Sequence, residues 1–504
     1  MFRPGSLGCK GVAGEQQLGM DFAVTRPEIM DMSATKVSAT TESLIVFQTS
    51  QGLEVRAIAL RLAKHQVVFE VYAPGVILRM SEVLTDFKIV INDQPVYSGR
   101  AVVSSLVNTG TLVVCEASLG DSWLGADVLP AIDRGPKLRE GFHEFLGQWQ
   151  KAYKVLPDFK LLIGDIQMFL TGLRLWLDQV ELAVRSTPSG DRLLLEKDVI
   201  HELTQPIVRC INALFEKFEI VAAGIPEEFE PVHHIYLKRQ LHPLVLCSPF
   251  AYRTYNKPLG YAGDYEMVDM ILRDPQEGSS LFAKLLNVWF LLQPPAEAHR
   301  NRIDYLTRKL AEETLRASSA NGLARIFSLG CGPAGEVQVF LTQHPVCGRA
   351  QITLLDFNDE TLAYTKSTVD GLKAKHRRTT DVQIIKKSVA HLLKNAGKQV
   401  ENSPKYDFLY CAGLFDYLTD RVCKQLMNVL YEMLAPGGLL LATNVDQSNP
   451  IRHMLDYVLE WHLLYRNGQQ LRALAPDQAD PDSISLRSDP TGVNIFLELR
   501  KPTP

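Results

Sequence analysis

The alternation of apolar and polar positions changes along the chain, which predicts regions of different architecture. Between residues 43 and 130, short runs rich in β-branched residues are separated by turn signals such as Asn108-Thr109-Gly110. Short strands at regular spacing are typical of a small β-barrel. Residues 1–42 hold many Gly, Ser, Thr and Met and show little periodicity. We therefore expect a flexible leader over 1–42 followed by a barrel over 43–130.

The next region, residues 137–320, has the periodicity of helices. Its apolar residues recur at i, i+3, i+4 and i+7, as an amphipathic helix requires. Gly- and Pro-containing stretches at 187–190 and 224–226 predict breaks between helices. This region is expected to be an α-helical domain.

Strand and helix patterns alternate from residue 321 to residue 504. Apolar runs such as 324–330 and 352–356 are separated by stretches long enough for helices. This is the βαβ rhythm of a doubly wound α/β sheet. The last two runs, 483–488 and 493–501, flank a turn and predict an antiparallel hairpin.

Composition and charge exclude several classes of protein. The 504 residues are 46% apolar and 22% charged, with a net charge of −4, so neither a disordered chain nor a nucleic-acid-binding protein is indicated. No apolar run reaches the roughly 18–20 residues of a membrane-spanning helix, and no secretory signal is evident. The eight cysteines form no CxxC pair, which favours reduced thiols in a cytoplasmic protein. His233, His234 and His242 lack the companions of a known metal pattern, so no metal is expected.

A glycine loop carries the clearest chemistry. The sequence Ser328-Leu329-Gly330-Cys331-Gly332-Pro333-Ala334-Gly335-Glu336 follows an apolar strand and precedes a helix. Asp356 ends the next strand, 24 residues after Gly332, near the spacing of a carboxylate that binds ribose hydroxyls. Pro333 has no N–H for a pyrophosphate, and no GK[ST] follows. The loop therefore favours S-adenosylmethionine, a cofactor that has no phosphate groups, over a dinucleotide.

On these motifs, together with 406–418 and 434–444, residues 321–504 resemble the class I S-adenosylmethionine-dependent methyltransferases. The resemblance implies a Rossmann-like, seven-stranded sheet and a set of cofactor-binding residues. Many members have an acid where this chain has Ser328, so Glu336 is the expected partner of the methionine ammonium. The implied cofactor-binding residues are Gly330, Cys331, Gly332, Gly335, Glu336, Asp356, Phe357, Ser388, Val389, Cys411, Ala412 and Gly413.

A closer resemblance includes the segment 250–267, which is aromatic, charged and punctuated by glycines. Together with 411–418, it is similar to a subfamily in which a PilZ-like barrel and a helical region precede the methyltransferase domain. Members are labelled 3-hydroxypalmitic acid methyl ester (extracellular factor, a quorum signal) biosynthesis proteins. We expect 250–267 to be a substrate lid; packing between domains is the alternative.

The candidate acceptor chemistry follows from the charge of the nucleophile. A carboxylate is already ionised near neutral pH and needs a cation or hydroxyl to place it, whereas a hydroxyl or amine needs a general base. Asp264, Asp416 and His462 are the candidate catalytic residues. Helix capping by Asp416 and core packing of a helix over 454–466 that carries His462 are the alternatives. The candidate substrate-binding residues are Arg253, Tyr261, Tyr265 and Tyr417.

The barrel has an incomplete nucleotide motif. PilZ domains bind cyclic di-GMP through RxxxR, but Arg56 and Arg61 are one residue too far apart, and only Gly75 matches the second motif. A structural or homodimer-forming barrel is therefore the favoured alternative. The stretch 366–398 holds nine Lys or Arg and two Asp; it is expected to be a solvated face, with an acyl-carrier protein or nucleic acid as the alternative partner.

The sequence thus predicts a methyltransferase that methylates the carboxylate of a 3-hydroxy fatty acid or similar small acid. Two alternatives stay open. One is methylation of an oxygen or nitrogen of another small metabolite. The other is a nucleotide-sensing regulatory protein whose methyltransferase fold binds the cofactor without turnover.

Overall fold

The computed structural model describes residues 43–63, 65–71, 76–91, 94–108, 113–120, 123, 139, 142, 143, 146, 155–395, 397 and 404–503. These residues all belong to one of the two units into which contacts divide the chain, Glu42–Pro504. The expected leader and most of residues 137–154, the first part of the region expected to be helical, lie outside the described residues.

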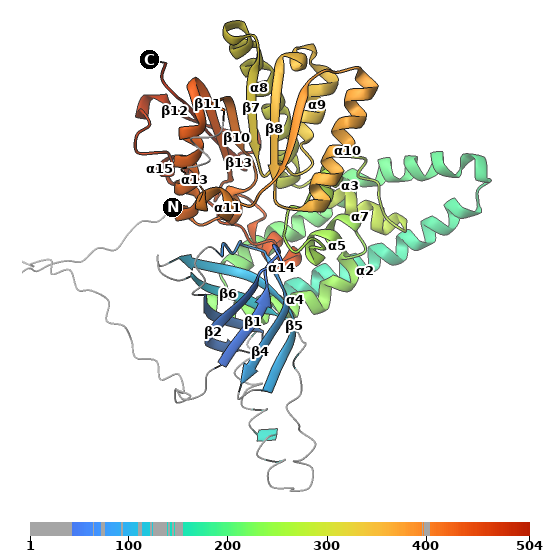
Figure 1. The fold of residues 1–504 in the computed structure, drawn as a ribbon. Coiled ribbons are helices and arrows are strands. Elements are labelled where there is room, and N and C mark those ends of the chain that lie inside the picture. The colour runs from blue at the N-terminus through green and yellow to red at the C-terminus, as the bar shows by residue number, and fades with distance from the viewer. Residues whose placement is uncertain are drawn as a thin grey trace, which may run out of the picture. The chain divides into compact units, whose positions relative to one another are not determined.

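The N-terminal strands close into a barrel, as predicted (Figure 1). In the described part of the chain, six strands pair antiparallel in the order β1-β2-β3-β6-β5-β4. Successive side chains of a strand point to opposite faces, and this fills the interior with rings: Phe47, Phe69 and Phe87 lie 5.5–5.9 Å apart between centroids. The bounds are β1 Ser43–Gln48, β2 Glu54–Ala63, β3 Gln66–Val71, β4 Val83–Ile91, β5 Gln94–Asn108 and β6 Val113–Leu119.

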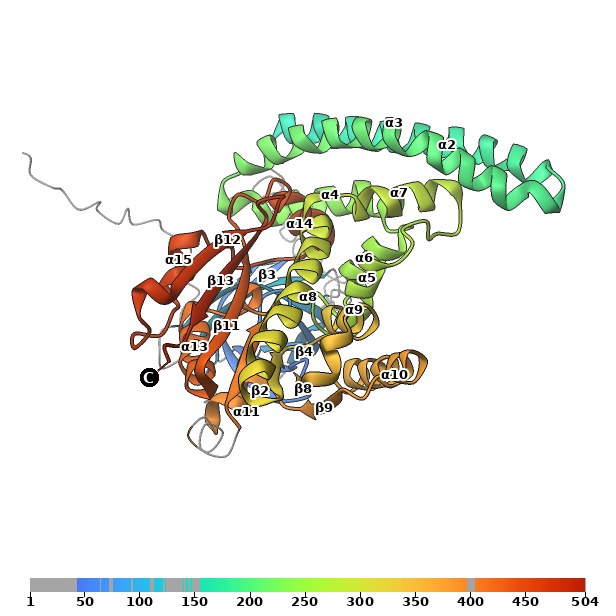
Figure 2. The ribbon, with the colours of Figure 1, turned by 90° about the horizontal axis from the view of Figure 1, so that it is seen from above.

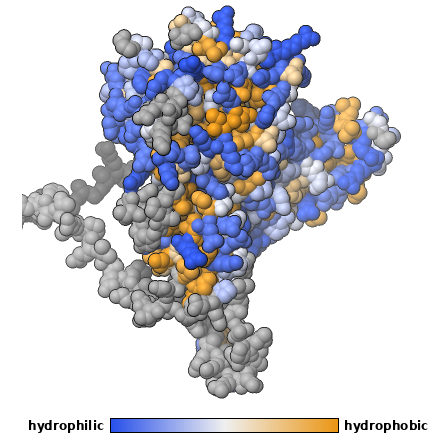
Figure 3. All heavy atoms as spheres, in the orientation of Figure 1, coloured by the Kyte–Doolittle hydropathy of each residue, from blue (hydrophilic) through white to orange (hydrophobic). Residues whose placement is uncertain are grey.

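The middle of the chain is helical, with breaks where Gly and Pro predict them. The long helices α2 and α3 lie side by side (Figures 1 and 2), and some of their apolar side chains are exposed; the surface of this hairpin is otherwise mostly hydrophilic (Figure 3). The other face of the hairpin packs with α4, α5, α6 and α7 in one apolar core. The bounds are α2 Pro157–Ser186, α3 Ser189–Ala223, α4 Glu230–Val245, α5 Pro249–Asn256, α6 Tyr265–Leu272, α7 Leu281–Leu291 and α8 Pro294–Asn321.

The C-terminal strands form the expected α/β sheet. Seven of the described strands are ordered β12-β13-β11-β10-β7-β8-β9; β13 is antiparallel to β11 and β12, and the other pairs are parallel. The predicted antiparallel hairpin is thus confirmed. The bounds are β7 Ala324–Leu329, β8 Ala350–Asp356, β9 Asp381–Lys386, β10 Tyr406–Cys411, β11 Leu434–Val445, β12 Ile484–Ser488 and β13 Asn494–Arg500.

Helices cover both faces of this sheet. Apolar side chains of α8, α9 and α10 pack on one face and those of α11, α13 and α15 on the other. The order of the strands reverses between β7 and β10, so a crevice opens at their carboxyl ends, where ligands bind in such sheets. The bounds are α9 Gly335–Gln343, α10 Asp359–His376, α11 Val389–Lys394, α13 Asp420–Met433, α14 Arg452–Leu459 and α15 Gly468–Ala473.

The helix expected over 454–466 is shorter than predicted. Helix α14 ends at Leu459 because Glu460 has a left-handed backbone with φ 47°, which stops a right-handed helix. His462 and Tyr465 therefore do not share a helical stripe with Met454.

Glu460 is the centre of a buried ionic cluster that joins the three regions. Its carboxylate accepts hydrogen bonds from Arg100 of the barrel at 2.7 Å and from Lys238 of α4 at 2.6 Å. The Lys257 ammonium, also buried, donates to the Leu459 carbonyl at 3.2 Å. Burial disfavours the Glu460 anion, but Lys238, Arg100 and Lys257 outweigh this and hold its pKa well below the ordinary value.

We expect Glu460→Gln to destabilise the protein by about 3–5 kcal/mol, because it leaves several buried cations uncompensated. Chemical denaturation monitored by circular dichroism measures this. Glu202→Gln, at an exposed position of α3, is the matched control and should change stability little. Equal stability of the two variants would contradict a structural role for the cluster.

The pH dependence of stability should carry the signature of Lys257. Burial, together with Arg100, lowers the pKa of Lys257 to about 7, whereas an exposed lysine has a pKa of about 10.4. Between these values the unfolded chain binds more protons than the native protein, so this group makes the free energy of unfolding rise from pH 7 to pH 10. Lys257→Met should remove that part of the slope in denaturation curves measured across this pH range; an unchanged slope would contradict it.

Candidate functional site

The glycine loop is fastened to the acid at the end of the neighbouring strand. Gly332 N donates to Asp356 Oδ2 at 3.1 Å, while the amides of Phe357 and Asn358 donate to Oδ1 at 2.7 and 3.1 Å. Burial raises the pKa of Asp356, and these hydrogen bonds act against that rise. The loop and the acid therefore form one rigid edge at the carboxyl ends of β7 and β8.

Asp356 lies in the first of three adjoining cavities, here called the Asp356 cavity. Segment 250–267 contributes two aromatic side chains to its lining, Tyr261 and Tyr265, and Tyr261 contacts Phe357 with ring centroids 5.1 Å apart. The predicted cofactor residues that line it are Gly330, Gly332, Asp356, Phe357, Val389 and Gly413.

The barrel supplies a wall of the same cavity. Arg79, which follows β3 and is 4% exposed, places its guanidinium carbon 4.0 Å from the centroid of the Phe357 ring. Its Nε has no hydrogen-bond partner in the described structure, and its charge opposes the burial that raises the pKa of Asp356. Met80 lies beside it and donates its amide to the Tyr417 carbonyl at 3.2 Å. The barrel is therefore part of the candidate site.

The second cavity, the Glu336 cavity, pairs one acid with one cation. Glu336 on α9 accepts a hydrogen bond from the Tyr410 hydroxyl at 2.7 Å, and burial raises its pKa. Arg302 on α8 lies across the same cavity, where burial lowers its pKa while Asp416 and Glu336 raise it. The predicted residues that also line it are Gly330, Cys331, Gly332, Gly335, Ala412 and Gly413.

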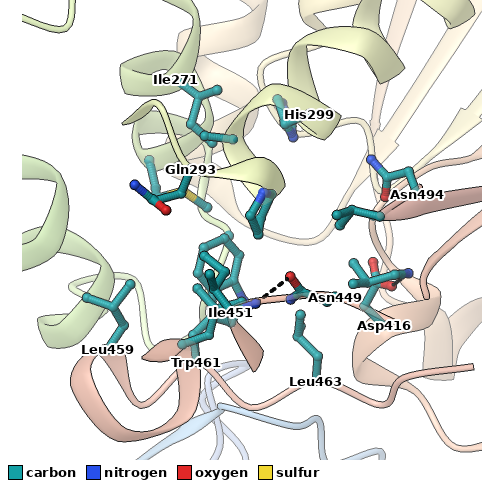
Figure 4. Close-up of a pocket in the computed structure, with 18 of the residues that line it drawn as sticks. Ile271, Gln293, His299, Asp416, Asn449, Ile451, Leu459, Trp461, Leu463 and Asn494 are labelled. Atoms are coloured by element: carbon teal, nitrogen blue, oxygen red, sulfur yellow. Dashed lines mark hydrogen bonds between the residues drawn. The ribbon is translucent and has the colours of Figure 1, made fainter. Parts of the chain in front are cut away.

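The third cavity is mainly apolar (Figure 4). Side chains of α5, α6, α7 and α14 line it, together with Trp461 and Leu463, and its volume is about 800 Å³ including the open mouth. Asp416 and Tyr417 of the 3₁₀ turn η4, Phe415–Tyr417, stand at its polar end with Arg302. Asp416 Oδ1 accepts from the Val445 amide at 2.6 Å, and burial raises its pKa. The predicted cap role of Asp416 is not observed, because Thr419 precedes α13.

Two glycines stand where all three cavities meet. Gly413 and Gly263 line each of them. A Cβ on Gly413 would lie 2.9 Å from Arg302 Nη1, and one on Gly263 would lie 2.9 Å from the Tyr417 hydroxyl. Both have φ above +70°, so glycine is required there for its backbone and for the space it leaves.

His299, which lines the Glu336 cavity and the apolar cavity, has a buried ring nitrogen without a partner among the described residues. Arg302 donates to His299 Nδ1 at 2.6 Å, and a guanidinium cannot accept, so the proton of the neutral ring is on Nε2. Burial and the charge of Arg302 lower the pKa of His299 well below the ordinary value. His299 Nε2 and the Asn494 side-chain oxygen have no partner in the described structure, and both residues line the apolar cavity.

Several predicted residues lie away from these cavities. Arg253 donates to Asp264 at 2.9 Å, and Asp264 also caps α6 by accepting from Met267 N at 2.9 Å, so the pair is occupied with holding the segment. Ser388 caps α11, and Cys411 is buried at the end of β10. None of these four is among the residues that line the three cavities.

His462 lies on a different cavity, next to the barrel. Its amide donates to Ser81 Oγ at 2.5 Å, and its ring contacts Asp456. The structure therefore does not bring His462 to Asp416 or to the glycine loop.

The candidate barrel-ligand motif is dispersed. Arg56 and Arg61 lie exposed on β2, and Arg61 donates to Gln66 Oε1 at 3.3 Å. Gly75 lies outside the described residues. Among the described residues, no group of His, Cys, Asp or Glu could hold a metal ion, and no helix has the length and apolarity to cross a membrane.

Sequence reasoning missed Arg79, His299 and Arg302. The spacing of His299 and Arg302 at i and i+3 on one helix face was a usable signal, since such residues are neighbours. No local signal points to Arg79, because its contact with Phe357 joins positions far apart in the sequence.

Comparison with known proteins adds solved structures of low similarity. No protein-family model and no curated protein matches the chain. A possible exported protein from Bordetella parapertussis is 17% identical, over 60% of this chain and 97% of that one, with a TM-score of 0.39. An O-methyltransferase family protein from Burkholderia thailandensis is 14% identical (54% and 71% covered, TM-score 0.31). Magnesium protoporphyrin IX methyltransferase from Synechocystis, with bound S-adenosylhomocysteine, is 11% identical (50% and 97%, TM-score 0.33). TM-scores below 0.5 carry no functional argument.

We expect Arg79→Met to weaken binding of S-adenosylmethionine, the cofactor that the glycine loop predicts, because the Phe357 ring loses the cation that fixes it in the wall of the Asp356 cavity. A desolvated cation–π contact is worth about 1–2 kcal/mol, so the loss of affinity should reach at most roughly 30-fold. Isothermal titration calorimetry with the full chain measures the dissociation constant. Arg56→Met, on the exposed face of the barrel, is the matched control and should bind like the wild type. Unchanged affinity of a folded Arg79 variant would show that the barrel does not take part in cofactor binding.

Proposed function

We propose that this protein is an S-adenosylmethionine-dependent methyltransferase that methylates the carboxylate of a small acid with an apolar body, such as a 3-hydroxy fatty acid. One observation carries the proposal. Two cavities suited to the two halves of the cofactor open at Gly413 and Gly263 into a third that is apolar. That arrangement lets a cofactor and an apolar acceptor meet at one point.

The charges of the first two cavities match those of the cofactor. The methionine half carries one ammonium and one carboxylate, and the Glu336 cavity offers one acid and one cation, Glu336 and Arg302. Asp356 is available for the ribose hydroxyls, and Arg79 and Phe357 for the adenine. When bound, S-adenosylmethionine supplies an activated methyl group on a positively charged sulfur.

Binding the acceptor falls to the third cavity. Its apolar lining would hold the hydrocarbon body, and the buried His299 Nε2–H, which has no partner in the described structure, would donate to the carboxylate. Arg302 fixes this tautomer and contributes positive charge beside Gly413. Alignment of acceptor and methyl group is the main contribution that a protein makes to such a displacement, and the rigid glycine junction favours it.

Asp416 supports a second candidate, methylation of a hydroxyl or an amine. Its carboxylate lines the apolar cavity, and burial raises its pKa toward the range of a general base. A hydroxyl or amine acceptor would lose its proton to Asp416, whereas a carboxylate acceptor would have none to give.

Methyl transfer from radiolabelled S-adenosylmethionine to a fractionated cell extract tests the proposal. For a carboxylate acceptor, we expect label in the organic phase that alkali releases as volatile methanol. Asp416→Asn should then retain most of the activity, because no proton has to be removed. A hydroxyl or amine acceptor predicts alkali-stable label and a loss of roughly 10²- to 10⁴-fold in Asp416→Asn.

Glu336→Gln tests the proposed methionine end of the cofactor site, with binding measured by calorimetry beside the transfer assay. We expect it to weaken cofactor binding because it removes the partner proposed for the ammonium.

Cofactor binding by the wild type without transfer to any fraction would overturn the enzymatic proposal and favour a regulatory protein.

A further inference from the structure

Helix α2 carries an apolar stripe on one of its faces. Leu161, Met168, Leu175 and Leu182 follow one another at intervals of seven residues, and each of them is 61–72% exposed. Seven residues are close to two turns of an α-helix, so these four side chains lie along one line of the helix surface. We call this set of four residues the α2 stripe.

The α2 stripe faces away from the core of the helical region. The buried residues of α2 pack with α3, α4 and α7, and at 3.6 residues per turn they lie about half a turn from the stripe. Among them are Phe159, Ile166, Leu170 and Leu177. A surface helix of a monomer normally presents polar residues on its outer face. The described part of the chain therefore leaves a second apolar face of α2 uncovered.

Two glycines lie within the same stripe. Gly164 lies between Leu161 and Met168, and Gly172 lies between Met168 and Leu175, at the spacings of three and four that keep residues on one helix face. Glycine within a helix costs about 1 kcal/mol relative to alanine, yet a Cβ at either position would meet nothing within 4 Å. Packing among the described residues does not require these glycines, whereas a second helix that approaches α2 closely would.

The apolar area of the stripe is large enough for a stable dimer. Trp176, which is 48% exposed, adds to the four stripe residues. Since a large apolar residue has a surface of roughly 200 Å², these five leave about 500–600 Å² uncovered. Apolar atoms make up about 60% of a protein interface, so this area corresponds to roughly 800–1,000 Å² on each copy. That reaches the standard interface, which covers about 800 Å² of each partner.

The charges of α2 are compatible with a second copy of the same helix. The helix contains four acids and three bases, so two copies repel each other only weakly. Helices that lie in the plane of a membrane surface are typically rich in Lys and Arg on the polar face, and α2 has no such excess. A seven-residue apolar repeat is instead the pattern of helices that pack against one another. The composition of α2 thus favours a second copy over a lipid surface.

We propose that a second copy of this chain covers the α2 stripe, so that the protein forms a twofold-symmetric dimer in which α2 packs against α2. A twofold interface uses the same surface patch on both copies and must therefore be self-complementary. The even spacing of the stripe satisfies this condition, because its side chains meet apolar side chains of the other copy whether the helices run parallel or antiparallel. The dimer does not depend on the methyltransferase activity proposed above.

Sedimentation velocity of the full chain at micromolar concentrations tests this proposal. We expect the wild type to have twice the mass of one chain. Met168→Glu should raise the dissociation constant at least roughly 100-fold, because each dimer carries the change twice at the centre of the interface. Since Met168 is 72% exposed, its circular dichroism spectrum should stay that of the wild type. The matched control is Ile58→Glu on the barrel, where Ile58 is 51% exposed, and it should stay dimeric.

Gly172→Leu distinguishes close helix packing from a general loss of apolar surface. The added side chain would occupy the space that the second helix needs, so we expect a weaker dimer although the surface becomes more apolar. Leucine is also a better helix former than glycine, so the helix content should not fall. A dimer that is as tight as the wild type, or tighter, would contradict close packing at Gly172.

Three other outcomes would overturn the proposal. A wild type that stays monomeric over the whole concentration range would refute the dimer. A dimer that Ile58→Glu dissociates and Met168→Glu does not would place the interface on the barrel. A monomeric wild type that sediments with phosphatidylcholine vesicles, and a Met168→Glu variant that does not, would assign the stripe to a lipid surface. All of these measurements can be made without a methyl acceptor, so they test the dimer separately from the proposed reaction.

Discussion

The buried carboxylate of Glu460 is the interaction on which the arrangement of the protein depends. Three cations converge on it, and they come from the barrel, from α4 and from the segment after α5. A buried charge is tolerated only when it is paired, so none of these regions can move away without leaving a costly unpaired group. The left-handed backbone of Glu460 also ends α14 and turns the chain toward the barrel. There, Ser81 accepts from the His462 amide and donates to its carbonyl, which anchors the strand-entry segment that carries Arg79.

A second constraint acts at the place where the cavities meet. Gly413 and Gly263 come from distant parts of the sequence, yet both are left-handed and both leave room for a polar side chain of another element. Segment 250–267 is held there by internal bonds, above all the Arg253–Asp264 pair and the cap that Asp264 provides. Residues that sequence reasoning assigned to chemistry therefore shape the wall of the site, while Arg302 and His299 supply its charge and its donor.

Local patterns were enough to predict the fold class but only part of the site. The barrel, the helical region and the sheet with its terminal hairpin follow from periodicity and turns, because those signals lie within a few residues. The glycine loop and Asp356 follow from a fixed spacing across one βαβ unit. The helix over 454–466 was wrong in its second half because tertiary ion pairs, invisible in the local sequence, force Glu460 out of the helical conformation. The place of Arg79 depends on a contact with Phe357, which is remote in sequence, and no periodicity reports such a contact.

The placement of Arg79 has a consequence for how such a chain can evolve. A barrel that contributes a side chain to the wall of the Asp356 cavity is not an exchangeable module, because replacing the barrel would leave that side of the cavity open. Substitutions are therefore expected to be tolerated differently at different positions of the barrel. The exposed faces of its strands can vary freely. The short stretch from Arg79 to Glu82 is constrained by two contacts, because the Glu82 carboxylate accepts from the Arg79 amide and the Phe357 ring contacts the Arg79 guanidinium. A change on either side of this wall, in the barrel or at the end of β8, therefore has to be matched on the other side.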